Sequence, residues 1–211
     1  MTTPARISKT LAYLHGHGSA QLPHMQTTLL AHLQGTCELL SHWNAAPDVC
    51  LAGLCHAVYG TEGLPAQLED PQRGTVLAEV IGTDAEQLVY FYASCDRRWL
   101  YGQVVAGAVV GVQEPAHRTL GAAFEAGQLQ GAISFRDRFT GQVFIPPPHL
   151  YAAFLELTFA NELEIIRRQP PEVSAGNRSV WEPLFEAWSP LVSKGAARAA
   201  RETFAHCRRA A

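Results

Sequence analysis

The spacing of apolar residues predicts a chain built mainly of α-helices. Between Met25 and Trp43 the apolar positions recur at intervals of three and four residues, which is the period of one helix face. The next segment, Pro47 to Tyr59, begins with a proline suited to a first helical turn and is apolar on nearly every side. Two consecutive buried helices are therefore expected near the N-terminus.

Further helices follow from periodicity and from residues that favour helix ends. A capping box of Thr83 and Glu86 predicts a helix start, and Ser179 with Glu182 predicts another after a loop at 169–178. Residues 104–112 fit either a helix or a strand. The remaining helices are expected at 5–14, 76–81, 119–128, 149–168 and after Pro190.

One short segment has the pattern of a β-hairpin. Residues 133–135 and 142–145 flank the turn-rich sequence RDRFTG. Strand is thus expected mainly within residues 132–146. The predicted fold class is mainly α, with a helical domain over residues 1–170, one small hairpin, and a C-terminal helical extension over 171–211 packed on it.

Three polar residues occupy positions where these helices should face the core. His32 lies in the apolar stripe of its helix, and His56 lies in the segment that is apolar almost all round. Asn161 replaces an aliphatic residue in the stripe of the long helix. Buried imidazole and amide groups need polar partners, so the three side chains are expected to line one cavity that binds a metal ion or an anion.

The segments HMQTTLLAHLQGT, VCLAGLCHAVYGTEG and TFANELEII, within residues 20–168, carry a resemblance to a known family. They resemble the HD-domain superfamily of metal-dependent phosphohydrolases, in layout most closely the Rel/SpoT-type alarmone hydrolases. The resemblance implies an HD-like helical domain in which the two metal-binding histidines are His32 and His56. The paired aspartate of the family corresponds to Ala57 and the distant aspartate to Asn161, as in an uncharacterised bacterial branch that lacks the paired Asp.

These departures change the metal site that the resemblance implies. Replacing Asp by Ala at position 57 removes a ligand and a negative charge, which weakens a divalent site. His32, His56, Asn161 and His24 are the expected ligands of Fe, Mn or Zn. Glu62 and Asp96 are further oxygen donors and the expected catalytic acids.

Each of these residues also has a purely structural interpretation. His32, His56 and Asn161 can be core residues that hydrogen-bond one another or the backbone, and His24 can cap a loop. Glu62 and Asp96 lie near helix ends, where carboxylates are usually solvated. The arginines near positions 97 and 136–138 form either surface ion pairs or a clamp for an anionic substrate.

Composition limits the classes of function. The 211 residues are 47% hydrophobic with a net charge of −3, which provides no basic surface for nucleic acid. The five cysteines include no CxxC pair, and neither a signal core nor an 18-residue apolar run is present, so a cytoplasmic protein without a membrane span is expected.

The expected activity is metal-dependent chemistry on a small anionic metabolite, with phosphoester hydrolysis as the default. One alternative is an iron-dependent oxygenase of small-molecule metabolism, and another is a non-catalytic ligand- or partner-binding module. The sequence leaves the substrate and the oligomeric state open.

Overall fold

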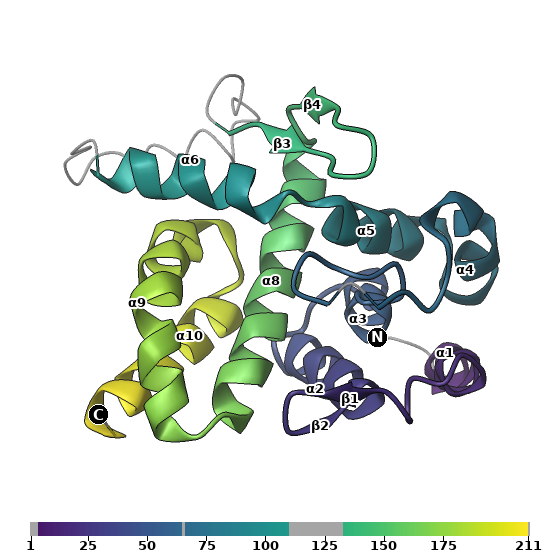
Figure 1. Cartoon of the computed structure of the whole chain (residues 1–211), viewed down its shortest axis with the longest axis horizontal. Helices are drawn as coiled ribbons and strands as arrows, with labels where there is room; N and C mark the ends of the chain where they lie inside the picture. Colours follow the sequence, from purple (N-terminus) through teal and green to yellow (C-terminus); the bar gives the residue numbers. More distant parts are fainter. Residues whose placement is uncertain (1–3, 65, 110–132, 211) are drawn as a thin grey trace.

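The computed structural model describes residues 4–64, 66–109 and 133–210, and these residues are mainly helical, as the sequence predicts (Figure 1). The helices within this part of the chain are α1 (Pro4–Gly16), α2 (Leu29–His42), α3 (Pro47–Cys55), α4 (Gly74–Ile81), α5 (Thr83–Ser94), α6 (Arg97–Val109), α8 (Pro148–Arg168), α9 (Pro171–Trp188) and α10 (Lys194–Ala210). Two 3₁₀ turns, η1 (Pro71–Arg73) and η2 (Ser189–Leu191), lie between them.

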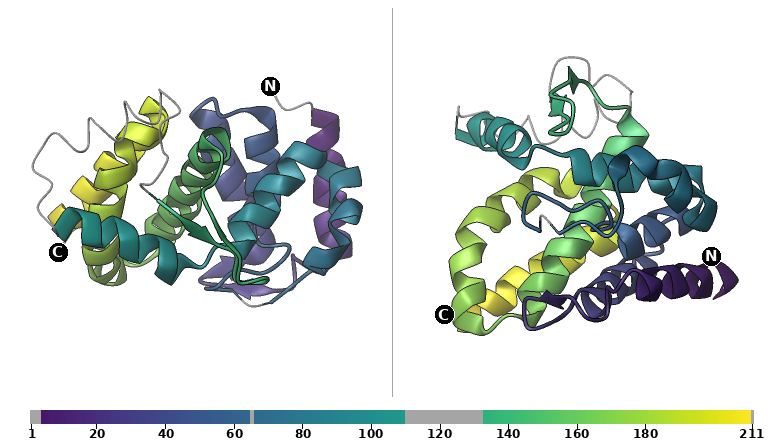
Figure 2. Two further views of the ribbon diagram at one scale, coloured as in Figure 1. Left: turned by 90° about the horizontal axis from the view of Figure 1, so that it is seen from above. Right: turned by 45° about the vertical axis from the view of Figure 1, so that its right-hand side comes forward.

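Helix α8 is the central element of the fold. It runs through the middle of the molecule, with α2, α3 and α5 on one side and α9 and α10 on the other (Figure 1). Its side chains are buried on most faces, including Phe154, Leu157 and Phe159, which have no exposed surface. Burial of these large side chains removes apolar surface from water and holds the two groups of helices together. Figure 2 shows α8 between the same two groups from above.

Small residues allow α2 to approach its neighbours closely. A Cβ atom added at Gly53 of α3 would lie 2.4 Å from Cδ1 of Leu40 on α2. A Cβ atom added at Gly35 of α2 would lie 2.7 Å from Oε1 of Glu164 on α8. Both distances are shorter than any ordinary van der Waals contact, so glycine at these positions lets α2 pack directly against α3 and α8.

The strands form two short antiparallel pairs. The predicted hairpin is confirmed as β3 (Phe135–Arg136) and β4 (Val143–Phe144), in which Phe135 pairs with Phe144. A second pair, β1 (Pro23–His24) with β2 (Thr27–Thr28), was not predicted, because two-residue strands are too short to show alternation.

This second hairpin changes the start of the following helix. The sequence predicts a helix from Met25, but α2 begins at Leu29, and the Thr28 side chain caps it by accepting a hydrogen bond from the Ala31 amide. Met25 is instead exposed in the turn, with a positive φ of 51° that is uncommon for a residue with a side chain.

Several other helix boundaries differ from the predicted ones. The capping box at Thr83 is wrong, since Gly82 is the N-cap residue and makes no side-chain cap. The Glu86 carboxylate accepts a hydrogen bond from the Tyr59 hydroxyl instead. The predicted loop at 169–178 is also wrong, because α9 begins at Pro171, whose fixed φ suits a first helical turn.

The remaining differences concern α3 and α6. Helix α3 ends at Cys55 and not at Tyr59, so His56 is its C-cap residue. Residues 97–109 are helical, which decides the helix-or-strand ambiguity for 104–109. The helix predicted at 119–128 lies outside the described residues. Within the described part of the chain, no helix is both long and apolar enough to cross a membrane.

Candidate functional site

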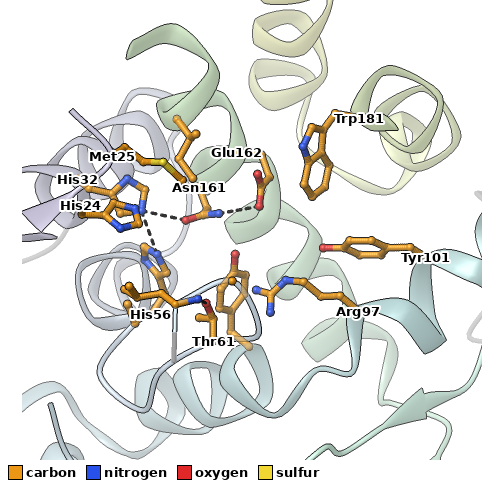
Figure 3. Close-up of a pocket in the computed structure, with 15 residues that line it drawn as sticks. His24, Met25, His32, His56, Thr61, Arg97, Tyr101, Asn161, Glu162 and Trp181 are labelled. Atoms are coloured by element: carbon orange, nitrogen blue, oxygen red, sulfur yellow. Dashed lines mark hydrogen bonds between the residues drawn. The ribbon is translucent and has the colours of Figure 1, made fainter. Parts of the chain in front are cut away.

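The three inward polar residues meet in one cavity of about 230 Å³ (Figure 3). His32 comes from α2, His56 from the C-terminal end of α3, and Asn161 from the middle of α8. All three are at least 90% buried. The other residues that line the cavity are His24, Met25, Ala57, Thr61, Gly63, Leu64, Tyr92, Arg97, Tyr101, Glu162, Ile165 and Trp181.

The hydrogen bonds of the two histidines fix which nitrogen faces the cavity. Nδ1 of His56 donates to the Gly53 carbonyl at 2.8 Å, because a carbonyl can only accept. Nδ1 of His32 donates to the Glu164 carboxylate at 2.5 Å. In the neutral form of each ring, the lone pair is therefore on Nε2.

These lone pairs point at each other and at an amide oxygen. The two Nε2 atoms are 3.3 Å apart, and Nε2 of His32 is 3.0 Å from Oδ1 of Asn161. The Asn161 amide is oriented by its Nδ2, which donates to the Glu162 carboxylate at 2.8 Å (Figure 3). Three hydrogen-bond acceptors thus converge in a buried site.

The electrostatics of the site disfavour protonation of His56. Burial, together with the smaller effect of the neighbouring His32, lowers the pKa of His56 to about 3. Nδ1 of His32, on the side of the ring away from the cavity, contacts the Glu164 carboxylate, which also forms an ion pair with Arg168. A carboxylate that accepts from the outer nitrogen of an imidazole is the usual second-shell partner of a metal-binding histidine.

His24 lies beside this cluster, at the end of β1. Its ring centroid is 4.5 Å from that of His32, and burial lowers its pKa. Its Nε2 atom is buried and has no hydrogen-bond partner among the described residues. The β1–β2 hairpin, which holds His24 against α2, is thus the element that brings a third imidazole to the cavity.

The other end of the cavity contains hydrogen-bond donors from α5 and α6. Arg97 lies over the ring of Tyr92, with Cζ 4.9 Å from the ring centroid. Nη1 of Arg97 and the hydroxyls of Tyr92 and Tyr101 are buried and make no hydrogen bond within the described part of the chain. The guanidinium lies close to the Tyr92 phenol and opposes the rise that burial causes in its pKa, but the hydroxyl makes no hydrogen bond of standard geometry.

Glu162 lies between the two ends. Its carboxylate, the guanidinium of Arg97 and the hydroxyl of Tyr101 point into the same space (Figure 3). Burial raises the pKa of Glu162 to about 7, against the opposing effects of Arg97 and of the Asn161 hydrogen bond. A carboxyl group in this range can both accept and donate a proton near neutral pH.

Glu62 and Asp96, the expected catalytic acids, do not line this cavity. The Glu62 carboxylate accepts from the Arg97 amide at 2.8 Å, and the Asp96 carboxylate accepts from the Trp99 amide at 2.9 Å. Both therefore satisfy free amides at the start of α6, and Asp96 also pairs with Arg136 at 3.7 Å. In the structure both carboxylates have a structural role at the start of α6, and their catalytic role stays a prediction.

Sequence reasoning missed Glu162, Tyr92 and Tyr101 as cavity residues and considered Arg97 only as one of several arginines. Glu162 follows Asn161 directly, and adjacent residues of a helix point about 100° apart, so periodicity assigned only Asn161 to the core. The aromatic run at 90–92 was a usable indication, because three consecutive aromatic residues cannot all face one side of a helix.

The donor set limits what the site can hold. Within the described residues, no three His, Cys, Asp or Glu side chains are arranged to hold a metal ion. The converging atoms are two imidazole nitrogens and one amide oxygen. Their spacing nevertheless fits a cation: two bonds of about 2.0–2.1 Å at about 109° place two nitrogens about 3.3–3.4 Å apart, and the observed separation is 3.3 Å.

Comparison with known protein families finds a match to part of the chain. Residues 13–97 match the model of a family described as a domain of unknown function (DUF6817). The matched segment contains His24, His32 and His56 and ends at Arg97, whereas Asn161 and Glu162 lie outside it. No protein in the curated set and no solved structure matches the chain.

Proposed function

We propose that this protein is a metal-assisted hydrolase of a small anionic metabolite, with a phosphate ester as the default substrate. The observation that carries the proposal is the convergence of three acceptors, Nε2 of His32, Nε2 of His56 and Oδ1 of Asn161, in a buried site. Acceptors at this separation repel one another unless a proton or a cation lies between them.

A cation explains this arrangement better than a proton. A proton shared by the cluster would make His32 or His56 an imidazolium, and burial strongly disfavours that state for His56. The Glu164 carboxylate behind His32 would strengthen the ring as a ligand, as in carboxylate–histidine–metal arrangements. The HD-like resemblance of the segments around these residues points to the same chemistry.

His32, His56 and Asn161 would hold the metal, with Fe, Mn or Zn compatible with imidazole and carbonyl donors. His24 is the nearest further imidazole. Because Ala57, which lines the cavity, provides no carboxylate, we expect weak binding. When bound, the metal would polarise a substrate oxygen and lower the pKa of water.

The remaining cavity residues define what the chain itself contributes. Glu162 is the carboxylate among the described residues that line the cavity, and it is placed to take up or release a proton. Arg97 is the charged donor for an anionic substrate. Leu64, Ile165 and Trp181 provide an apolar part of the cavity wall.

A second candidate is a non-catalytic ligand-binding module. It is favoured by the neutral donor set, in which Ala57 and Asn161 stand where the resembled family has aspartates. In that case Nε2 of His32 would carry a hydrogen and donate it to Oδ1 of Asn161, for which the 3.0 Å distance is also suitable.

Metal content separates these two candidates. We would express the full chain without a metal-binding tag, measure Fe, Mn and Zn by mass spectrometry, and titrate metal-free protein with each ion. Loss of binding in His56→Gln, with binding retained in His42→Gln on the exposed surface of α2, is the expected result. Equal metal content in the natural protein and His56→Gln would refute the proposed site.

Activity requires a separate test. A phosphatase screen with p-nitrophenyl phosphate would compare the natural protein, His56→Gln and the double variant Ala57→Asp, Asn161→Asp. The double variant returns two carboxylates to the cavity, so we expect tighter metal binding and a higher rate. Metal binding without hydrolysis of any ester in the screen would refute the hydrolase assignment but not the metal site.

A further inference from the structure

The end of the cavity away from the histidines contains three buried donors for which the described residues provide no acceptor. These are Nη1 of Arg97 and the hydroxyls of Tyr92 and Tyr101. Tyr92 is only 1% exposed, so its hydroxyl cannot simply turn to bulk water. Leaving several buried donors unpaired costs about 1–3 kcal/mol for each one, so a folded chain rarely keeps a group of them without a ligand or bound water.

All three donors face the same cavity and come from adjoining elements. Tyr92 is near the end of α5, and Arg97 and Tyr101 are one turn apart on α6. Two side chains four residues apart lie on the same helix face, which places the guanidinium beside the Tyr101 hydroxyl, as Figure 3 shows. The fold therefore presents a planar charged donor flanked by two neutral ones.

We propose that these three residues form a carboxylate-binding subsite that anchors the substrate. A guanidinium matches the two oxygens of a carboxylate, and the phenols can donate to the remaining lone pairs. The claim that the bound carboxylate belongs to the substrate rests on the proposed function. The carboxylate-binding site itself requires no metal.

The charge of the cavity selects an anion with a single charge. Arg97 is the cationic side chain among the described residues that line it, and the carboxyl group of Glu162 points into the same space (Figure 3). A dianion would leave at least one negative charge uncompensated in a buried site, which is costly. A carboxylate carries one charge, so it fits where a phosphate dianion does not.

The walls of the cavity indicate the rest of the ligand. Trp181 packs edge-on against Tyr101, with ring centroids 5.6 Å apart, and lines the cavity with Leu64 and Ile165. These apolar surfaces suit a short hydrocarbon or aromatic body. The subsite therefore accepts a small carboxylic acid whose opposite end reaches the His32–His56–Asn161 cluster.

The test is a binding titration of the full chain after metal removal with a chelator. Phenylacetate, acetate and inorganic phosphate would be titrated at neutral pH by calorimetry and by the shift of the Trp181 indole signal. We expect phenylacetate to bind more tightly than acetate, and acetate more tightly than phosphate. Tyr92→Phe and Tyr101→Phe should each weaken phenylacetate binding about tenfold or more, as expected for loss of a hydrogen bond to a charged group.

Two further variants complete the test. Arg97→Lys keeps the positive charge but removes the planar pair of N–H donors that matches a carboxylate. It should also weaken phenylacetate binding about tenfold. Tyr13→Phe is the matched control, because it removes another buried hydroxyl without a partner in the described structure, outside the cavity, and should leave the affinity unchanged.

The outcomes separate the subsite from the proposed function. Tighter binding of phosphate than of acetate would overturn the assignment to a carboxylate. Carboxylate affinity that is equal in the natural protein and both tyrosine variants would overturn the subsite. Carboxylate binding that survives in His56→Gln, together with absence of metal in the natural protein, would support the subsite while refuting the metal-assisted hydrolase.

Discussion

Tyr92 and Tyr59 provide a direct test of the cavity, because both phenols are buried but only the Tyr59 hydroxyl has a hydrogen-bond partner in the described structure. Tyr59 has no exposed surface and Tyr92 only 1%. The Tyr59 hydroxyl donates to Glu86 at 2.8 Å, whereas the Tyr92 hydroxyl has no hydrogen-bond partner within the described structure. Replacing each by Phe removes one oxygen atom, so the substitutions are matched in volume.

The expected effects on stability have opposite signs. Tyr59→Phe removes a hydrogen bond to a carboxylate and leaves Glu86 without its donor, so the free energy of unfolding should fall by about 2 kcal/mol. Tyr92→Phe removes a buried donor that lacks an acceptor, and the free energy of unfolding should rise by about 1 kcal/mol. For a chain of this length the two changes correspond to shifts in Tm of about 2–4 °C per kcal/mol.

Urea unfolding followed by circular dichroism, without metal or ligand, measures both effects. The slope of free energy against urea should be the same for all three proteins, so that the midpoints report stability alone. A loss of stability in Tyr92→Phe equal to that in Tyr59→Phe would show that the Tyr92 hydroxyl is already satisfied in the free protein. The inference that it is held ready for a ligand would then be refuted.

Three other substitutions test the packing and charge of the site. Glu164→Gln breaks the ion pair between the buried Glu164 carboxylate and the partly exposed Arg168 guanidinium, so the free energy of unfolding should fall by about 2–3 kcal/mol in denaturant titrations. A change below about 0.5 kcal/mol would contradict this. Gly53→Ala should lower the free energy of unfolding by about 1–2 kcal/mol in thermal unfolding, because the added Cβ would lie 2.4 Å from Cδ1 of the buried Leu40. This clash outweighs the gain in helix propensity, and an unchanged Tm would argue against the close packing. The lowered pKa of His56 means that the unfolded chain takes up a proton below about 6.5 and the folded chain only near about 3. Stability should therefore fall as the pH decreases through this interval, and less steeply in His56→Gln, when unfolding is measured in a chelator.

The sequence by itself determined the fold class and the inward direction of the three central polar residues. The period of the apolar positions places His32 and Asn161 on buried helix faces, and the structure has them there. The hairpin at β3 and β4 was visible because its turn is rich in polar residues and glycine. These are local properties, since each depends on a few neighbouring residues.

Helix boundaries were less predictable where tertiary contacts compete with local preferences. Glu86 has the spacing of a capping box with Thr83, but its carboxylate accepts from Tyr59 on another segment. Met25 fits the apolar stripe of α2, yet the β1–β2 hairpin places it outside the helix. In each case a contact between segments distant in sequence decides the outcome.

Only the tertiary structure decided which polar residues share the cavity. Periodicity shows that a side chain points inward, but not which other inward face it meets. Glu62 and Asp96 looked like candidate acids because they lie near helix ends, and the fold uses both to cap α6. Glu162 and Arg97 line the same cavity because α6 packs against α9, and α9 packs in turn against α8. These helices are remote from one another in sequence. The sequence thus determines which groups are buried, and the packing of α8 against its neighbours determines their chemistry.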